Sequence, residues 1–345
     1  MWKRDARYEF IRVVSMLSAV IVHTSANVIG SSLADTLPGH LFATVLYFCN
    51  GVFFMISGKF ALSVTCHTME DYRKYYLKRL GSIGIPVLVC FLFRSMFNIG
   101  WWPEYFLSRE FLKEYIRNVL YGFATCEYWF LYRLAGFLAA APFLGKMLQQ
   151  MSNKELMLLT AMGIAYNALA TYLPVAGYSL AWTFPMADWL ILFLMGYVVE
   201  RVVQTEKEEK AMLLLGAVAY AVCILLKLVG LMAGIHDMAP TYANLSCATY
   251  VGLKRIYRPG RIADAIVIQL GKLTMPVYLL HMMVVYTLVP HIPQWPGMIR
   301  WLALLAATLV LTLLLSFVLD RTVFAALLWL YRKITGLESK TVRNR

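Results

Sequence analysis

Charge is scarce in this sequence. Only 15% of its 345 residues are Asp, Glu, Lys or Arg, whereas 60% are apolar and the mean hydropathy is +0.64. Five segments contain no charged residue at all: 13–34, 36–58, 156–187, 273–299 and 301–319. A helix needs about 20 mostly apolar residues to cross a bilayer. Soluble cores do not supply so many such segments, so the sequence predicts an all-α, polytopic membrane helix bundle.

Acidic residues are few compared with basic ones, 19 against 32, which gives a net charge of +13. We predict about ten transmembrane helices, at roughly 9–29, 41–66, 80–100, 128–147, 156–174, 183–200, 211–233, 238–254, 264–290 and 299–319. With the N-terminus inside, most basic residues fall in inner segments, and the outer segments hold only Arg94, Arg109, Lys113, Arg117 and Arg300. This asymmetry predicts a multi-pass plasma (inner) membrane protein with both termini cytoplasmic. It also makes a nucleic-acid partner unnecessary.

Several signals are missing. No A-x-A cleavage site follows the basic start, so we expect that segment to be retained as the first span. The six cysteines show no metal-ligand spacing, so we predict no metal and interpret them as small packing residues. Without repeats or low-complexity tracts, we expect a single domain over 1–345, with spans over about 9–321 and a short cytoplasmic tail at 322–345. We expect a short interfacial helix at 322–332, and any chemistry among the spans.

One loop is long, the outer segment 101–127. Its apolar residues recur at helical spacing, namely Phe111, Leu112, Tyr115, Ile116, Val119 and Leu120. Basic residues line another face of the same helix. This pattern predicts an amphipathic helix that lies in the outer interface of the membrane.

The first span carries an ionisable residue near each end. Arg12 and His23 are eleven residues apart, so on a helix they share a face about 16 Å apart. Glu9 precedes Arg12 by three residues and is predicted to pair with it. Arg12 alone could be an anchor that reaches the inner headgroups. His23 lies deeper, where a polar ring needs a partner or water.

The second span is polar on one face. Asn50 and Ser57 are seven residues apart and share that face, while Gly51 and Gly58 permit close contact with another helix. Lys59 follows in the inner half, where an ammonium group needs an anion or a path to the interface. Prolines are expected to bend the third and ninth spans.

The polar residues of the spans are graded across the membrane. Inner positions supply cations, namely Arg12, Lys59, Lys78, Arg79 and Lys272. Outer positions supply histidines and carboxylates, namely His23, His281, Glu127 and Asp188. A cationic inner mouth suits a phosphorylated cytosolic donor. A histidine suits removal of a proton from a hydroxyl group. The combination favours group transfer across the membrane over simple permeation.

Four motifs in this order resemble the acyltransferase-3 family of integral membrane acyltransferases. They are YEFIR (8–12) with R-x10-H, FFMISG (53–58), WFL (129–131) and GKLTMPVYLLH (271–281). The resemblance covers nearly the whole chain. It implies transfer of an acyl group, usually acetyl, from cytosolic acyl-CoA to extracytoplasmic sugars or other acceptors. It also implies that His23 is catalytic and that Arg12 helps to shape the donor site. The chain departs from the family at Ser82, where a second arginine is common, and at Lys59, where an aromatic residue is common.

These observations lead to an O-acetyltransferase hypothesis. The phosphates of acetyl-CoA would be bound by Arg12, Lys59, Lys78, Arg79 and Lys272. His23 would act as general base on an acceptor hydroxyl or carry the acyl group itself, and both routes stay open. Glu127 or Asp188 would orient the ring, and His281 is a second catalytic candidate. The oxyanion or acceptor candidates are Asn50, Ser57 and Tyr278. The partners would be acyl-CoA, a cell-envelope glycan or another hydroxyl-bearing acceptor, and the lipid bilayer.

A second interpretation is a transporter or substrate-uptake module without acyl chemistry. Membrane domains similar to this family occur fused to serine racemases, where such a role has been suggested. Spans bent at proline are compatible with alternating access. The sequence contains no inverted repeat and no fused racemase, so this interpretation stands second.

Overall fold

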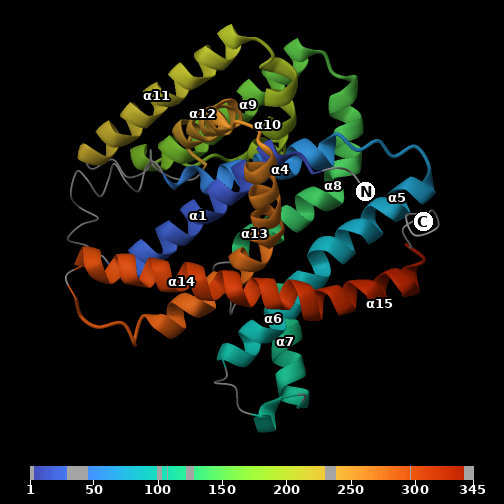
Figure 1. Cartoon of the computed structure of the whole chain (residues 1–345). Helices are drawn as coiled ribbons and strands as arrows, with labels where there is room; N and C mark the ends of the chain where they lie inside the picture. Colours follow the sequence, from blue (N-terminus) through green and yellow to red (C-terminus); the bar gives the residue numbers. More distant parts are fainter. Residues whose placement is uncertain are drawn as a thin grey trace. The chain divides into compact units, whose positions relative to one another are not determined.

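The computed structural model describes residues 4–28, 46–98, 103–106, 108–121, 128–229, 238–295 and 297–337. Over these residues the chain forms helices, turns and short irregular links, and no strand (Figure 1). The helices are α1 (Ala6–Val28), α4 (Phe48–Leu62), α5 (Met69–Arg79), α6 (Ile85–Asn98), α7 (Arg109–Tyr121), α8 (Trp129–Gln150), α9 (Asn153–Tyr172), α10 (Asp188–Val202), α11 (Glu206–Leu228), α12 (Pro240–Ile256), α13 (Arg261–Leu288), α14 (Gly297–Leu319) and α15 (Ala325–Thr335). The predicted all-α class is therefore confirmed for the described residues.

Six helices among the described residues are long and apolar enough to cross a membrane: Met69–Asn98, Trp129–Gln150, Asn153–Ala176, Glu206–Leu226, Arg261–Leu288 and Gly297–Thr335. Each of the ten segments predicted as spans contains a helix. The other four are α1, α4, α10 and α12. Of these, α4, α10 and α12 are short, with 15, 15 and 17 residues. The structure thus supports six of the ten predicted crossings by helix length and composition, and the other four stay a prediction.

Apolar side chains on the long helices are widely exposed. Along α11 the exposed positions include Leu214, Val218 and Leu225, and along α14 they include Val310 and Leu314. In both helices, only 22% of the most apolar 18-residue stretch is buried inside the protein. Such surfaces are costly in water but suit contact with lipid chains. The chain is therefore a multi-pass membrane protein.

Two long helices contain a π-helical turn. Leu80–Gly84 joins α5 to α6 just before Pro86, and Asp320–Phe324 joins α14 to α15. The second turn corrects the sequence prediction of a separate interfacial helix at 322–332, because the helix instead continues to Thr335. A π-turn adds one residue without ending the helix. In the sequence, the charged residues Asp320 and Arg321 at the start of this turn resemble the end of a helix.

Contacts between Cα atoms divide the chain into two compact units. The first unit comprises Met1–Thr65, Ala140–Thr274 and Gln294–Leu305. The second unit comprises Cys66–Ala139, Met275–Pro293 and Ala306–Arg345. The boundaries fall inside α8, α13 and α14, so both units share these three helices.

In the first unit, α4 packs closely on α10 and α11 packs on α12. A Cβ atom on Gly58 of α4 would overlap the carbonyl oxygen of Phe193, and one on Gly196 of α10 would overlap that of Met55. Gly51 likewise lies against the side chain of Ser246 in α12. The predicted close contact at Gly51 and Gly58 is confirmed. Small residues let these backbones approach, as is common between helices in membranes.

In the second unit, tyrosine hydroxyl groups connect the helices. Tyr75 and Tyr76 of α5 donate hydrogen bonds to the carbonyls of Leu138 and Ala139 in α8, at 3.0 and 2.8 Å. Tyr331 of α15 donates to a carbonyl of α5 at 2.9 Å. The bonds give the buried Tyr75, the half-buried Tyr331 and the exposed Tyr76 a partner for the phenol group. These bonds fix α5, α8 and α15 relative to one another within the unit.

The predicted amphipathic segment forms α7. Tyr115 donates a hydrogen bond to the carbonyl of Leu88 in α6 at 2.8 Å, and Phe111 is buried. Leu112, Ile116 and Leu120 stay exposed, at 54%, 48% and 70%. The helix therefore exists with an uncovered apolar side, while its position in the outer interface stays a prediction.

Candidate functional site

The helix α1 carries the predicted catalytic histidine. It is unbroken from residue 6 to 28, so steps of three and four residues place four side chains on one stripe: Arg12, Met16, Ala19 and His23. Met16 and Ala19 are only 2% and 5% exposed. Because the two middle residues of the stripe are buried, the stripe faces the protein. Arg12 lies at one end and the half-buried His23 lies at the other.

The His23 end of the stripe is held by α14. The indole Nε1 of Trp301 donates a hydrogen bond to the hydroxyl of Thr24 at 3.2 Å, and both groups are buried. The Thr24 hydroxyl in turn donates to the carbonyl of Val20 at 2.9 Å. His23 thus sits beside a fixed point of the first unit.

At the other end of the stripe, Arg12 has a carboxylate partner. Arg12 donates to Glu9 at 2.9 Å, and Arg4 donates to the other oxygen of Glu9 at 3.2 Å. The Glu9 side chain is only 5% exposed and packs against Gly271 of α13, where a Cβ atom would overlap it. This confirms the predicted Glu9–Arg12 pair. A buried carboxylate shared by two arginines fixes Arg12 in place.

Lys59 lies near Arg12 over aromatic rings. Its ammonium group is 4.2 Å from the centroid of Tyr8 and 4.7 Å from that of Phe60. The Arg12 guanidinium is 5.3 Å from the Phe60 centroid. Aromatic faces attract cations. The structure therefore brings Arg12 and Lys59, two of the predicted donor-binding cations, to one place.

A carboxylate that sequence reasoning did not select stands beside them. Glu200, near the C-terminal end of α10, accepts a hydrogen bond from the hydroxyl of Tyr250 at 2.7 Å. Both of its oxygens accept from Lys254, at 3.1 and 3.0 Å. Tyr8 also lies within the electrostatic reach of Glu200. Lys59 lies within the electrostatic reach of Glu200 and Lys254. Glu200 thus gives this cluster a central anion.

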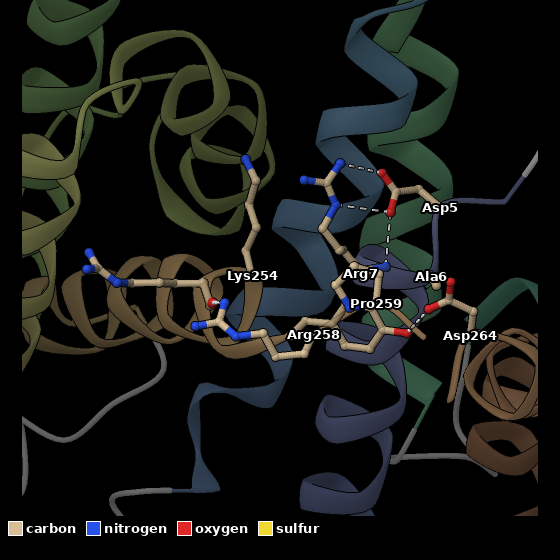
Figure 2. A pocket seen from close by; sticks show the side chains of 9 residues that line it. Asp5, Ala6, Arg7, Lys254, Arg258, Pro259 and Asp264 are labelled. Carbon is tan, nitrogen blue, oxygen red and sulfur yellow. Dashed lines mark hydrogen bonds and ion pairs between the residues drawn. The ribbon is translucent and has the colours of Figure 1, made fainter. Parts of the chain in front are cut away.

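Next to this cluster is a pocket of about 450 Å³. It lies between the start of α1, the end of α12 and the start of α13, and is lined by Asp5, Ala6, Arg7, Lys254, Arg255, Tyr257, Arg258, Pro259 and Asp264 (Figure 2). Four of these residues are cationic and two are carboxylates, so the lining carries a net charge of +2. The pocket belongs entirely to the first unit.

The two carboxylates of the pocket have protein partners. Arg7 binds Asp5 through its backbone N–H at 3.0 Å, Nε at 3.3 Å and Nη2 at 3.0 Å. Partial burial raises the pKa of Asp5, but these hydrogen bonds outweigh it and hold the pKa below its usual value. Asp264 accepts from the Tyr257 hydroxyl and from the Gly260 N–H. Burial, together with the bond to Asp264, raises the pKa of Tyr257 to about 12.

The remaining predicted cations lie elsewhere. Lys272, on α13 in the first unit, donates to Gln269 at 3.1 Å. Lys78 and Arg79 belong to the second unit. Lys78 is exposed, and the Arg79 guanidinium is 5.3 Å from the centroid of the Tyr75 ring. The predicted donor site is therefore divided between the units, with three of its five cations in the first.

His281 is in the second unit and is 1% exposed. Its Nδ1 lies 2.7 Å from the carbonyl oxygen of Tyr278 and 3.3 Å from that of Val277. The Tyr278 ring packs edge-on against Phe130, with centroids 5.8 Å apart. Two helical carbonyls and an aromatic neighbour therefore fix the orientation of this imidazole.

The other candidates have varied surroundings. Asn50 and Ser57 are half-buried on α4. Asp188 begins α10 with a φ of 56°, a conformation that costs energy for a residue with a Cβ. Its backbone N–H donates to the side chain of Asn167 at 2.8 Å, and its carbonyl accepts from the same side chain at 3.2 Å. Glu127 lies outside the described residues.

Sequence reasoning missed Glu200, Tyr250 and the pocket arginines. The run LKRIYRPGR (253–261) was interpreted only as an inner charge marker. Glu200 directly follows an uncharged stretch at 189–199. This is the signal that could have selected it, since a carboxylate in such a place requires a partner. The cysteines behave as predicted, because all five that the structure describes are buried free thiols.

Comparison with known proteins assigns the chain to a family. A family model described as an acyltransferase domain, Acyl_transf_3, matches residues 5–321, which include α1 with its Arg12–His23 stripe and residues of both units. Neither the curated proteins nor the solved structures contain a match. Because the family match covers nearly the whole helical membrane chain, this protein belongs to the acyltransferase-3 family.

Proposed function

We propose that the protein is a membrane O-acyltransferase. It transfers an acyl group, which we take to be acetyl, from cytosolic acyl-CoA to a hydroxyl group of an extracytoplasmic sugar or cell-envelope glycan. The family match over residues 5–321 supports acyl transfer. The observation that carries the proposal is the protein-facing stripe of α1, because it joins a cation cluster at Arg12 to an imidazole at His23.

The proposed topology has ten spans, two cytoplasmic termini and α7 in the outer interface of the plasma (inner) membrane. The six long apolar helices support a multi-pass protein. The concentration of basic residues in alternate segments supports the orientation. The exposed Leu112, Ile116 and Leu120 of α7 support its contact with lipid. We propose that the two compact units act together as one domain, since the family domain includes both.

The donor is proposed to enter from the cytoplasm. Its phosphates are bound by the cations near the inner ends of the helices, namely Arg12, Lys59, Lys78, Arg79 and Lys272. Lysine and arginine are the usual protein groups for phosphate. The aromatic rings beneath Lys59 and the Glu9 carboxylate beneath Arg12 support preorganised cations rather than mobile surface charges.

At the other end of the stripe, His23 is proposed to act on the acceptor hydroxyl. One ring nitrogen takes the hydroxyl proton while the acceptor oxygen attacks the thioester carbon, and the resulting imidazolium returns the proton to the departing CoA sulfur. The C–O bond thus forms as the C–S bond breaks. Glu127 is proposed to orient the ring, and Asn50, Ser57 and Tyr278 are proposed hydrogen-bond donors to the oxyanion or the acceptor. His281 is a second proposed catalytic group.

Inside-out membrane vesicles, which expose the cytoplasmic face, test this proposal with acetyl-CoA labelled in its acetyl group. We expect wild-type vesicles to release CoA and to incorporate label into envelope material. We expect His23→Ala to lower incorporation about 100-fold or more, which is the usual contribution of a general base. The exposed His291 provides the matched control variant, His291→Ala.

Two outcomes would overturn the proposal. One is wild-type vesicles that neither release CoA nor transfer label, as expected of a transporter without acyl chemistry. The other is a folded His23→Ala protein as active as His291→Ala, since catalysis would then not involve this imidazole. Thermal unfolding of the purified variants establishes that they are folded.

A further inference from the structure

The basic pocket at the start of α1 is not used by the residues assigned above. Among its cations, Lys254 is neutralised by Glu200. Arg255 is bound by two carboxylates, Glu206 at 3.0 Å and Glu209 at 3.2 Å. These two side chains therefore have their charges balanced by the protein.

Arg258 and Arg7 differ from them. Arg258 is exposed and donates to the carbonyl of Arg255 at 3.1 Å, and no carboxylate pairs with it among the described residues. Asp5 binds the Nε and Nη2 of Arg7, which leaves its Nη1 directed away from that carboxylate (Figure 2). The guanidinium donors of the pocket that no carboxylate occupies are therefore those of Arg258 and of one edge of Arg7.

The pocket is also fixed in shape. Tyr257 is buried, and its ring lies 5.2 Å from that of Phe10 on α1. Its hydroxyl group donates to Asp264 on α13. The residue before Arg258 thus joins α12, α1 and α13. Because the backbone beside it is anchored, Arg258 loses less freedom on binding an anion than a residue on an open loop would.

The distance to His23 limits what the anion can belong to. Arg7 and His23 lie sixteen residues apart on the unbroken helix α1, which corresponds to about 24 Å along its axis. A free phosphate bound at Arg7 is too small to extend to His23. An extended CoA molecule does, because the pantetheine arm and the diphosphate separate its thioester from the phosphate on its ribose.

We propose that Arg258 and Arg7 bind the 3′-phosphate of the CoA donor. This inference rests on the proposed function, in that it assumes a CoA thioester reacting near His23. A phosphomonoester dianion supplies acceptor oxygens for the guanidinium donors of Arg258 and Arg7 that no carboxylate occupies. Charge-assisted hydrogen bonds from guanidinium groups to phosphate are stronger than hydrogen bonds between neutral groups. The pocket is thereby a specificity site that distinguishes CoA from analogues without this phosphate.

Binding to the full-length protein in phosphatidylcholine nanodiscs tests the inference without catalysis. The ligands are CoA and 3′-dephospho-CoA, and calorimetry gives their dissociation constants. We expect the wild-type protein to bind CoA at least about tenfold more tightly, as a hydrogen bond to a charged group provides. Arg258→Gln should weaken CoA binding about tenfold and leave 3′-dephospho-CoA unaffected. Arg332→Gln, which changes an exposed arginine of α15, should affect neither ligand.

A variant that gains affinity excludes misfolding as the explanation. Asp5→Asn removes one of the two carboxylates of the lining and so makes the pocket more positive by one charge. It also releases the edge of Arg7 that Asp5 binds. We expect this variant to bind CoA more tightly than the wild type, with a smaller effect on 3′-dephospho-CoA.

The outcomes separate the inference from the proposed function. Wild-type protein that binds neither ligand would overturn the CoA donor itself. Equal binding of both ligands, or equal losses for both in Arg258→Gln, would place the 3′-phosphate elsewhere and overturn the inference alone. A third result would also overturn the inference, by assigning the pocket to a lipid phosphate. In that case phosphatidylglycerol in the nanodiscs would stabilise the wild-type protein against heat, Arg258→Gln would abolish this stabilisation, and the protein would bind CoA and 3′-dephospho-CoA equally.

Discussion

The surroundings of His281 determine where its proton lies. Both groups beside Nδ1 are carbonyl oxygens, those of Tyr278 and Val277. A carbonyl oxygen only accepts, so in the neutral ring Nδ1 carries the hydrogen and Nε2 carries the basic lone pair. Histidines that act as bases are commonly positioned through their other nitrogen in this way. The geometry therefore suits a reactive Nε2.

Replacing His281 with Asn tests this role. The Asn side-chain amide can retain the donor to the Tyr278 carbonyl but has nothing equivalent to Nε2. We expect His281→Asn to unfold at nearly the wild-type temperature and to lose at least tenfold in acetyl transfer, because only the basic nitrogen is removed. His281→Ala should lose both activity and stability. Wild-type turnover in the folded Asn variant would instead make His281 a structural residue.

At the residue scale, the sequence predicts local pairs better than distant ones. Glu9 and Arg12 are three residues apart, so helical spacing predicted their ion pair. Glu200 and Lys254 are separated by 54 residues, and nothing in the sequence indicates that α10 and α12 bring them together. Lys59 could be selected as a cation in an apolar span, but the aromatic rings beneath it depend on packing between α1 and α4.

At the scale of elements, the seam between α4 and α10 is controlled by glycine. Each helix places a glycine against the backbone of the other, Gly58 at Phe193 and Gly196 at Met55. Backbone atoms cannot move aside as a flexible side chain can. The seam also positions Lys59, the residue after Gly58, and Glu200, which lies one turn beyond Gly196. Packing at the seam thus bears directly on the cation cluster.

We expect Gly58→Ala to destabilise the protein by about 1–3 kcal/mol, the usual cost of overpacking. Gly136→Ala is the matched control, because Gly136 is exposed on α8 and nothing lies within 4 Å of an added Cβ. That change should be neutral or stabilising by up to about 1 kcal/mol, since Ala favours helix. Thermal unfolding in detergent measures both. Equal melting temperatures for the two variants would show that the seam tolerates a methyl group.

Helices could be predicted from the apolar runs because a run without charge in this length range has few other structures in lipid. Their ends and joints were harder to predict. Asp320 and Arg321 indicated a helix end, yet the chain continues through a π-helical turn into α15. A π-turn has no strong sequence signature, since it depends on how neighbouring turns pack.

At the scale of the whole molecule, the family match and the compact units describe different properties. The family domain extends over residues 5–321, whereas the unit boundaries fall within α8, α13 and α14. No linker marks these boundaries, so composition could not predict them. The order of the four sequence motifs, by contrast, was enough to predict the family.

The number of crossings can be tested through α10, which is not among the six long apolar helices. Lys113 on α7 and Lys207 on α11 are both exposed. In the proposed topology three spans separate them, α8, α9 and α10, so they lie on opposite sides of the membrane. If α10 did not cross, only two spans would separate them and both residues would lie on the same side.

We therefore expect a membrane-impermeant maleimide to label Lys113→Cys in intact cells and Lys207→Cys only after permeabilisation. The wild-type protein gives the background, to which the five described native cysteines should contribute little because they are buried. Labelling of both variants in intact cells would remove α10 from the spans. It would also place Glu200, and with it the cation cluster, on the same side as α7, where a cytosolic donor could not reach it.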